Sequence, residues 1–421
     1  MIPREFHPFS LKSNVAIILN YRGLKMHIIH TFGHLLGGIL LVAGTSIGVG
    51  MLALPVATAA GGFVPSFVIY LLCWVFMMCT GLLILEACVW MPKDANLITL
   101  TDRLLGKWGK SACWIIYLFL FFCLMVAHTS AGGSVLFEIS HQTIPVWAGV
   151  IIYVLFFSPV VYLGTKWVDR LNLLLMAGVA ITYLTFAYSS FSYIDFSLLK
   201  RSNWSQALWG IPVIFTAFGF QILIPTLMTY LNRDIRKMRL AIIFGTSIPF
   251  LMYVVWEMII LGIIPLEGPT GLTEALKAGQ NAVNPLGGYL NNPTLLALGQ
   301  IFAFFAMTTS FVGISIAFVD FLADGLKVQK KGVKKLGLCA LIFLIPMFIA
   351  ILDPKIFFLA LNYAGGLGVA LLLGAIPILM VWAGRYYQGH SLLHQQLPGG
   401  KILLSMLMTF VVIVLAITLI V

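Results

Sequence analysis

The stretch VAGTSIGVGMLALPV, residues 42–56, decides the fold. It lies in an apolar run long enough to cross a bilayer, yet residues that weaken helices fall near its centre: Gly44, Gly48, Gly50 and Pro55. Backbone groups released from a helix cannot face lipid, so they must line a cavity walled by protein. Secondary transporters build substrate and ion sites from broken helices of this kind. The stretch therefore predicts a transporter with its site at this break.

The composition predicts an all-α polytopic membrane protein whose surroundings are a lipid bilayer. The 421 residues are 61% hydrophobic and only 9% charged, whereas about 25% would be charged in a soluble domain. The net charge of +11 would suggest nucleic acid as a partner of a soluble protein. Here basic residues retained in cytoplasmic loops explain the charge, so we expect no nucleic-acid partner.

A membrane-spanning helix needs about 20 apolar residues, and this rule predicts eleven spans. They are residues 33–60, 63–90, 111–137, 144–164, 170–191, 207–230, 240–264, 294–319, 336–352, 356–384 and 401–421.

The distribution of basic residues predicts the orientation. With a cytoplasmic N-terminus, 21 of the 25 Lys and Arg residues, Arg385 among them, fall in inside segments. The outside segments then hold only Lys200, Arg201, Lys277 and Lys355. This asymmetry supports the number of spans and a periplasmic C-terminus.

Two loops are predicted to contain helices. Residues 94–110 place four leucines on one face of an amphipathic surface helix: Leu97, Leu100, Leu104 and Leu105. Residues 265–293 form a long external loop rich in Pro and Gly, with a short helix over 272–278.

The sixth span repeats the pattern of the first. It reads WGIPVIFTAFGFQILIPTLMTY, residues 209–230, and breaks at Thr216–Gln221, with Gly219 and then Pro225. An odd number of spans in each unit inverts the second unit relative to the first, so the site is expected where the two breaks meet. This predicts a cytoplasmic segment 1–32, repeats over 33–191 and 207–384, and an extra span over 401–421.

The chemistry of the two breaks suits an amino acid. N–H groups at half-helix N-termini suit a carboxylate, and exposed carbonyls suit an ammonium group. Phe218, Phe220 and Phe311 could flank an apolar or aromatic side chain, although any of them could equally be a packing residue.

Few ionisable side chains lie within the predicted spans. Glu86 could carry a proton or brace helix packing, and for Glu257 we favour packing. His128 could titrate, bind a substrate hydroxyl or simply pack. Lys166 could anchor the fifth span at the membrane surface or reach the first break.

The remaining polar residues could serve in cation binding or catalysis. The hydroxyl run Thr308, Thr309 and Ser310 could hold a cation beside the first span, or bond between helices. The six cysteines lack metal-ligand spacing, and we expect neither a metal nor a cofactor. A membrane enzyme is disfavoured because no polar or metal cluster converges.

Several stretches resemble the hydroxy and aromatic amino acid permeases of the amino acid–polyamine–organocation superfamily, and tyrosine-specific permeases most closely. The four main ones are VAGTSIGVGMLALP (42–55), IPVIFTAFGF (211–220), DIRKMRLAIIFGTSIPFLMYVVWEM (234–258) and TTSFVGISIAFVDFLADGL (308–326), and GTKWVDRLN (164–172) also fits. The resemblance implies eleven spans, a leucine-transporter-like five-plus-five core and proton-driven uptake of aromatic amino acids.

The resemblance also implies the residues of the substrate site: Thr45, Ser46, Gly48, Gly50, Thr216, Ala217, Phe218, Gly219 and Phe220. Gln221 stands where tyrosine-type members carry histidine, so tyrosine and tryptophan both stay open. The first 25 residues have no counterpart in the family, and we expect Met26 to be the native start.

These observations predict a symporter of the bacterial inner membrane that imports tyrosine, or tryptophan or phenylalanine, with protons. The alternative is sodium coupling through Thr309 and Ser310. Transport would proceed by alternating access, with spans one, two, six and seven rocking against the rest.

Overall fold

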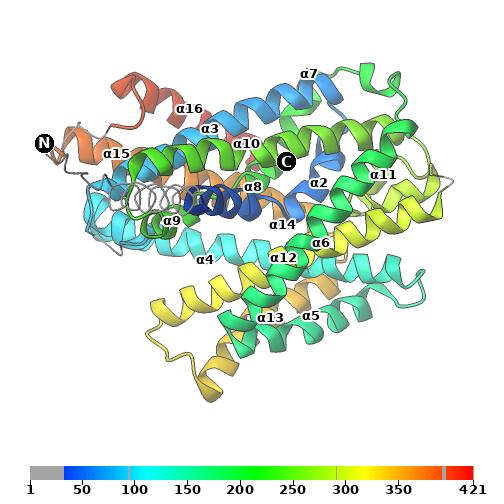
Figure 1. The fold of residues 1–421 in the computed structure, drawn as a ribbon, viewed down its shortest axis with the longest axis horizontal. Helices are drawn as coiled ribbons and strands as arrows, with labels where there is room; N and C mark the ends of the chain where they lie inside the picture. The colour runs from blue at the N-terminus through cyan, green and yellow to red at the C-terminus, as the bar shows by residue number, and fades with distance from the viewer. Residues whose placement is uncertain (1–32, 93–94, 291, 391–394, 421) are drawn as a thin grey trace, which may run out of the picture.

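The computed structural model describes residues 33–92, 95–290, 292–390 and 395–420. The segment 1–32 and the expected start at Met26 lie outside these residues. The spans of the described chain are helical apart from breaks in the first and sixth (Figure 1). The α-helices are α2 (Val49–Thr58), α3 (Phe63–Val89), α4 (Leu97–Ile139), α5 (Val146–Leu163), α6 (Thr165–Ser190), α7 (Trp204–Ala207), α8 (Ile211–Ala217), α9 (Ile224–Tyr230), α10 (Ile235–Ile263), α11 (Leu272–Lys277), α12 (Pro293–Gly325), α13 (Gly332–Leu352), α14 (Ile356–Tyr363), α15 (Ile376–Tyr386) and α16 (Gly400–Ile420).

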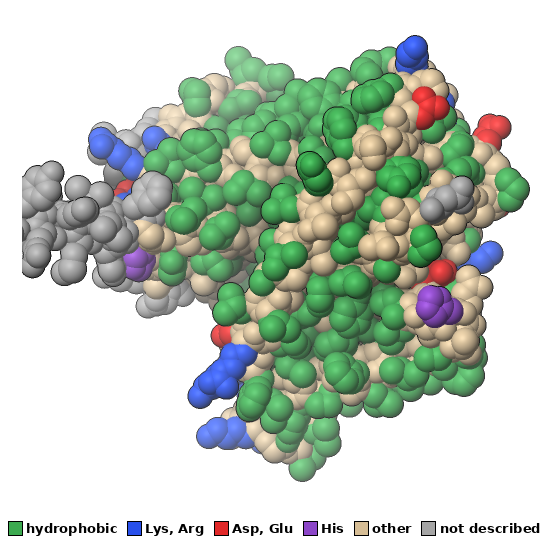
Figure 2. Space-filling model, turned by 45° about the vertical axis from the view of Figure 1, so that its right-hand side comes forward, with side chains coloured by type: hydrophobic (Ala, Val, Ile, Leu, Met, Phe, Trp, Pro, Cys, Tyr) green, Lys and Arg blue, Asp and Glu red, His purple; other side chains and the backbone are tan. Residues whose placement is uncertain are grey.

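The number of spans agrees with the sequence prediction. Ten helices of the described chain are long and apolar enough to cross a membrane. An eleventh span is a bent pair, Gly33–Ser46 and Gly50–Thr58, whose halves differ in direction by 52°. The surface fits this assignment, because hydrophobic side chains cover the middle of the molecule and charged ones lie towards its margins (Figure 2).

The helices pack as two groups. In one group α3 packs on α10, and α2 contacts both α8 and α10. In the other group α4, α5, α6, α12 and α13 pack on one another. Figure 1 places α5 and α13 on the side of the molecule opposite α3 and α10, whereas α6 crosses between the groups and contacts α10. The rocking of one group against the other stays a prediction.

Several helices extend beyond the predicted spans. The predicted surface helix exists, but it joins the third span as α4, with a break in helical geometry only at Gly106, where φ is 74°. Leu97, Leu100 and Leu104 of its apolar face are buried. Hydropathy could not locate the ends of these helices, because helical hydrogen bonding continues past the hydrocarbon core of the bilayer. The short loop helix is confirmed as α11.

The tenth span contains a π-helical segment, Ala364–Ala375, that the sequence did not predict. It packs closely on α8, since a methyl group added at Gly365 would overlap the Pro212 carbonyl oxygen. Only glycine permits this approach of two backbones. Wide helical turns of this kind are frequent at functional sites, and this one lies directly behind the second break.

Candidate functional site at the two helix breaks

The first and sixth spans break at the same place in the molecule. The first is interrupted at Ile47 and Gly48, and α8 ends at Ala217. The two broken helices nearly touch there, because a Cβ atom added to Gly50 would lie 2.7 Å from the Ala217 Cα. Glycine at this position therefore allows the two breaks to meet, as the repeat pattern predicted.

Tyr253 of α10 joins the two breaks. Its hydroxyl lies 2.6 Å from the Ser46 carbonyl oxygen and 2.9 Å from the Ala217 carbonyl oxygen, so its single proton is shared between the two acceptors. Each oxygen belongs to the last helical turn before a break, where carbonyl groups have no N–H partner within the helix. The sequence analysis expected these carbonyls to be open to an ammonium group, whereas in this conformation the tyrosine hydroxyl occupies them.

The second break is stabilised by Gln221. Its side-chain oxygen accepts from the Phe220 backbone N–H at 3.0 Å. Its Nε2 donates to the Met77 carbonyl at 3.1 Å and to the Thr80 hydroxyl at 3.0 Å, both on α3. Gln221 is fully buried, so it belongs to the framework that holds the break open.

Thr216 and Gly219 complete the backbone of the second break. The Thr216 hydroxyl donates to the Leu361 carbonyl at 2.9 Å and ties α8 to α14. The Gly219 N–H donates to the Thr216 carbonyl at 3.4 Å. The break is therefore braced by two neighbouring helices, α3 and α14.

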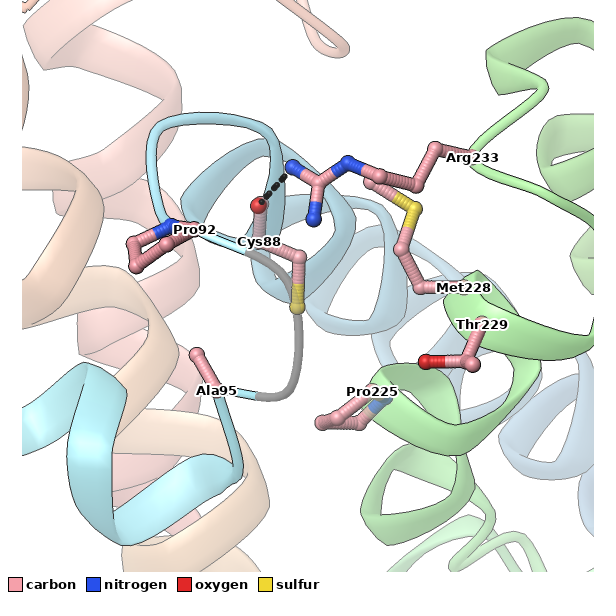
Figure 3. A pocket seen from close by; sticks show the side chains of 7 residues that line it. All are labelled: Cys88, Pro92, Ala95, Pro225, Met228, Thr229 and Arg233. Atoms are coloured by element: carbon pink, nitrogen blue, oxygen red, sulfur yellow. Dashed lines mark hydrogen bonds between the residues drawn. The ribbon is translucent and has the colours of Figure 1, made fainter.

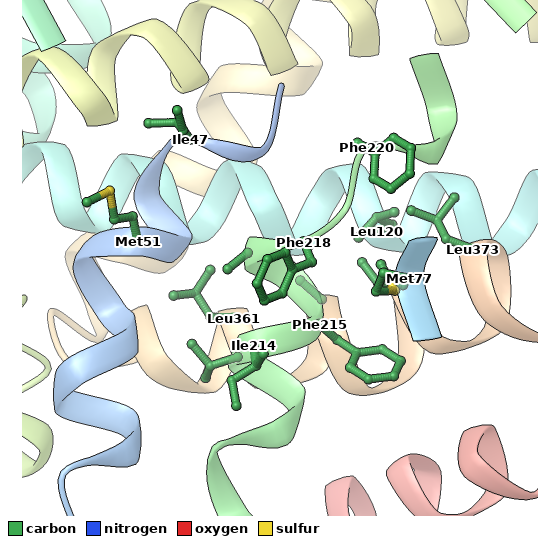
Figure 4. Close-up of a cluster of buried hydrophobic side chains, with 14 of the residues drawn as sticks. Ile47, Met51, Met77, Leu120, Ile214, Phe215, Phe218, Phe220, Leu361 and Leu373 are labelled. Carbon is green, nitrogen blue, oxygen red and sulfur yellow. The ribbon is translucent and has the colours of Figure 1, made fainter. Parts of the chain in front are cut away.

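Apolar side chains surround the breaks from several helices. In Figure 4, Ile47 and Met51 of the first span lie near Phe218 of the second break, with Leu361 close by. The Phe218 ring meets the Tyr253 ring edge to face at 5.1 Å. Phe311 packs on Tyr153, with ring centroids 4.9 Å apart. Such walls suit an apolar or aromatic group more than a sugar or a bare ion.

Some buried polar atoms of the described chain have no hydrogen-bond partner. They include Ser46 Oγ at the first break, and His128 Nε2 and Thr129 Oγ1 on α4. His128 is held by its other nitrogen, which lies 2.7 Å from the Leu124 carbonyl oxygen. An unpaired buried polar atom costs free energy, so these three atoms are candidates for contacts with a polar ligand.

The hydroxyl run on α12 approaches the first break. A methyl group added at Gly48 would overlap the Ser310 side chain. The Thr309 hydroxyl hydrogen-bonds the Asn172 side chain of α6, and the Tyr153 hydroxyl donates to Thr308 at 3.3 Å. Ser310 is thus the member of the run that faces the break.

Two predicted site residues point elsewhere. The Thr45 side chain is exposed, and its hydroxyl donates back to the Leu41 carbonyl at 2.7 Å. Lys166 is exposed in the first turn of α6. The structure brings neither side chain to the point where the breaks meet.

Glu86 lies in an ion pair away from the breaks. Its two carboxylate oxygens accept from the Arg385 guanidinium at 2.6 and 2.7 Å, and one also accepts from the Gln396 backbone N–H at 2.8 Å. The expectation that Arg385 lies in a loop was wrong, because it is buried in the last turns of α15. A bidentate contact of this kind fixes the geometry of both side chains.

A small pocket opens at the loop ends near this pair (Figure 3). Its lining residues are Cys88, Pro92, Ala95, Pro225, Met228, Thr229 and Arg233. The Arg233 guanidinium donates to the Cys88 and Met91 carbonyls, each at 2.9 Å, and so caps the end of α3. We interpret this pocket as a helix-capping site, separate from the breaks.

Comparisons with known proteins decide the family. The model of the tryptophan/tyrosine permease family matches residues 32–418. The chain belongs to this family. It is 30% identical to a tryptophan-specific transport protein of Shigella flexneri, over 89% of this chain and 92% of the relative. It is 27% identical to the tyrosine-specific transport system 1 of Haemophilus influenzae, over 90% of this chain and 95% of that relative.

The fold is shared with a solved transporter. The crystal structure of MhsT in complex with L-phenylalanine matches with a TM-score of 0.63 at 15% identity, over 91% of this chain and 97% of that one. The leucine-transporter-like fold and the assignment to a transporter family rather than an enzyme family are confirmed, and the protein is a multi-pass membrane protein. The exact repeat boundaries stay a prediction.

Tyr253 was not among the predicted site residues. A signal was present, because Thr246, Tyr253 and Glu257 follow one another at intervals of seven and four residues, which places them on one face of α10. A polar face on a membrane helix points inward to partners. That face reaches both breaks and the C-terminal end of α2.

Proposed function

We propose that this permease imports an aromatic amino acid, tryptophan or tyrosine, together with protons. The observation that carries the proposal is the meeting of two broken helices at Tyr253 in a chain of the tryptophan/tyrosine permease family. The specificities named for the relatives support the substrate class.

The substrate zwitterion would lie between the breaks. Its ammonium group would compete with or join the Tyr253 hydroxyl at the Ser46 and Ala217 carbonyls. Its ring would lie near Phe218 and Phe311, where a hydroxyl or indole N–H could reach His128 Nε2. A site that hydrogen-bonds a substrate group rejects analogues that lack it, so His128 is a candidate for discrimination between aromatic substrates.

The membrane and orientation follow from charge and from the relatives. Bacterial relatives support the inner membrane. The excess of Lys and Arg on one side supports a cytoplasmic N-terminus and a periplasmic C-terminus. In this orientation the Glu86–Arg385 pair lies towards the cytoplasm, and the loop that contains α11 lies outside.

Sodium coupling is the second candidate. The observation in its favour is that Ser310 lies against Gly48, so a hydroxyl of α12 faces the freed backbone of the first span. A cation there would be coordinated by hydroxyl and carbonyl oxygens. The identity of the gradient that drives uptake separates the two candidates.

The site assignment is tested by Gly48→Leu, with Gly313→Ala on α12 as the matched control. The leucine would overlap Ser310 and fill the break, whereas a methyl group at Gly313 meets no atom within 4 Å. We expect the first variant to reach the membrane and to lose uptake of labelled tryptophan and tyrosine, and the control to keep it. Competition by phenylalanine and leucine ranks the substrates. Normal uptake by Gly48→Leu would contradict the site.

A further inference from the structure

A second buried carboxyl, Glu257 on α10, lies at the external end of the first span. It is 1% exposed and lies six residues before the end of the helix, roughly 9 Å along its axis. Its Oε1 is 2.6 Å from the Thr58 hydroxyl oxygen on α2, and its Oε2 is 2.7 Å from the Tyr70 hydroxyl oxygen on α3. The carboxyl therefore joins three helices.

The number of short contacts exceeds the number of hydroxyl protons. Besides the Glu257 contact, the Thr58 oxygen lies 2.7 Å from the Leu54 carbonyl oxygen. A longer contact of 3.3 Å also joins the Thr58 and Tyr70 oxygens. One hydrogen in each of the three shorter contacts, at 2.6, 2.7 and 2.7 Å, requires three hydrogens. Thr58 and Tyr70 supply two. A proton on Glu257 supplies the third: Glu257 donates to Thr58, Thr58 donates to Leu54, and Tyr70 donates to Glu257.

The surroundings of Glu257 offer no charge that would favour an ionised carboxylate. In the described ranges no Lys, Arg or His nitrogen forms an ion pair with it, and its hydrogen-bond partners are the Thr58 and Tyr70 hydroxyls. An unpaired buried charge is costly, whereas a protonated carboxyl needs only hydrogen bonds.

The other ionisable and charged groups near this end have different partners. Tyr253 lies one turn away on α10 and bonds the two breaks. The Arg201 guanidinium bonds the Ala59 carbonyl at the end of α2. The Asp195 carboxylate accepts from the Ser197 N–H at 2.8 Å. From α6, the aromatic Phe186 packs on Trp256, and the Tyr183 hydroxyl donates to the Met252 carbonyl of α10 at 3.0 Å.

We propose that Glu257 is the site that binds and releases the transported proton. This inference rests on the proposed proton coupling. The proton would enter from the periplasmic side, stay on the carboxyl while α2, α3 and α10 are packed together, and leave when water reaches the carboxylate during the conformational cycle. The proton itself is neither created nor consumed, since Glu257 only carries it between the two aqueous sides.

The position of Glu257 explains how proton and substrate could affect each other. Thr58 is the last residue of α2, whose other end begins at the first break. Tyr253, on the same helix as Glu257, bonds the Ser46 carbonyl of that break. Movement of α2 on substrate binding would therefore change the distance between Thr58 and Glu257. Substrate binding and protonation of Glu257 would both act on the position of α2. Such a shared element is the physical requirement for coupling the two events.

The test uses the full chain in proteoliposomes, with Glu257→Gln compared with Glu267→Gln, the same change on an exposed loop carboxylate. Counterflow measures exchange of labelled tryptophan without an ion gradient, and a second assay measures accumulation driven by an inward proton gradient. We expect Glu257→Gln to keep counterflow within about twofold and to lose gradient-driven accumulation. Glu267→Gln should keep both.

The outcomes separate the two proposals. Wild type that accumulates nothing under a proton gradient would overturn the proposed coupling. Wild type and Glu257→Gln that accumulate equally would overturn only the role of Glu257. If the variant fails to fold, infrared spectra of wild-type protein labelled with carboxyl-¹³C glutamate decide. A protonated-carboxyl band at neutral pH supports the proposal, because Glu86 is the only other buried glutamate described and it is ion-paired. Absence of the band overturns it.

Discussion

Glu86 and Glu257 are equally hidden from solvent, at 0% and 1% exposure, but they have opposite surroundings. Glu86 meets a guanidinium and a backbone N–H, so its charge is matched. Glu257 meets two hydroxyls and no cation among the described residues. Burial sets the cost of a charge, and the partners decide whether that cost is met by pairing or by a proton.

The two carboxyls also mark opposite ends of one helix group. Tyr70 lies near the start of α3 and Glu86 near its end. The charged pair joins α3 to α15, and the hydroxyl cluster joins α3 to α2 and α10. We infer that the Glu86–Arg385 ion pair holds α3 and α15 together throughout the transport cycle. The hydrogen bonds of Glu257 with Thr58 and Tyr70, in contrast, can change when Glu257 gains or loses a proton.

The largest effect is expected at the ion pair. Arg385→Ala leaves the Glu86 carboxylate buried without its counter-charge, which should lower the free energy of unfolding by about 3–5 kcal/mol. The double variant Glu86→Gln with Arg385→Met removes both charges and should recover most of the loss. Denaturant unfolding in detergent micelles measures both. A single variant as stable as wild type would show that the pair does not fasten the helices.

A smaller effect is expected at Tyr70. Tyr70→Phe removes one hydrogen bond to Glu257, and a neutral acceptor makes that bond worth about 1 kcal/mol, against about 1.5–3 kcal/mol for a charged one. The matched control is Tyr188→Phe, the same change on a side chain that is 88% exposed. Unfolding at pH 7 compares them. A loss of about 3 kcal/mol at Tyr70 would indicate an ionised Glu257 instead.

Asp234, outside the membrane spans, gives the smallest effect and a reference for an ordinary carboxylate. Partial burial opposes its charge, but hydrogen bonds from the Lys237 and Arg236 N–H groups, together with the Lys237 ammonium, lower the pKa of Asp234. A carboxylate whose pKa is lowered by folding contributes its full stabilisation at pH values above its unfolded-state pKa. This stabilisation of the folded protein is lost as the pH falls through the folded-state pKa.

Asp234→Ala should therefore cost about 1 kcal/mol at pH 7, the usual value of a helix N-cap. The difference from wild type should shrink as the pH falls below roughly 4, where the unfolded-state carboxyl begins to protonate. Unfolding at both pH values measures this. A difference in the free energy of unfolding that grows on acidification would contradict a lowered pKa of Asp234 in the folded protein.

The sequence predicted the features that depend on local composition. Gly48, Gly50 and Gly219 marked the breaks, and the run of leucines from Leu97 marked the surface helix. These features could be predicted because backbone N–H and C=O groups in the bilayer core need hydrogen-bond partners. Residues that weaken a helix within a span therefore indicate a place where protein, and not lipid, surrounds the backbone.

The partners of polar residues could not be predicted. Arg385 lies 299 positions from Glu86, and only the fold brings them together. Arg385 was assigned to a loop because basic residues near span ends usually lie there. Glu257 was assigned to packing because the sequence does not show that Thr58 and Tyr70 lie beside it.

The most direct test of the account measures the proton itself. Proteoliposomes that contain wild-type protein and an internal pH dye are placed in sodium-free buffer with no imposed gradient, and tryptophan or tyrosine is added outside. Proton symport predicts acidification of the interior that depends on the substrate and is absent from protein-free vesicles. Uptake of the labelled substrate without acidification, or only after sodium is added, would contradict proton coupling.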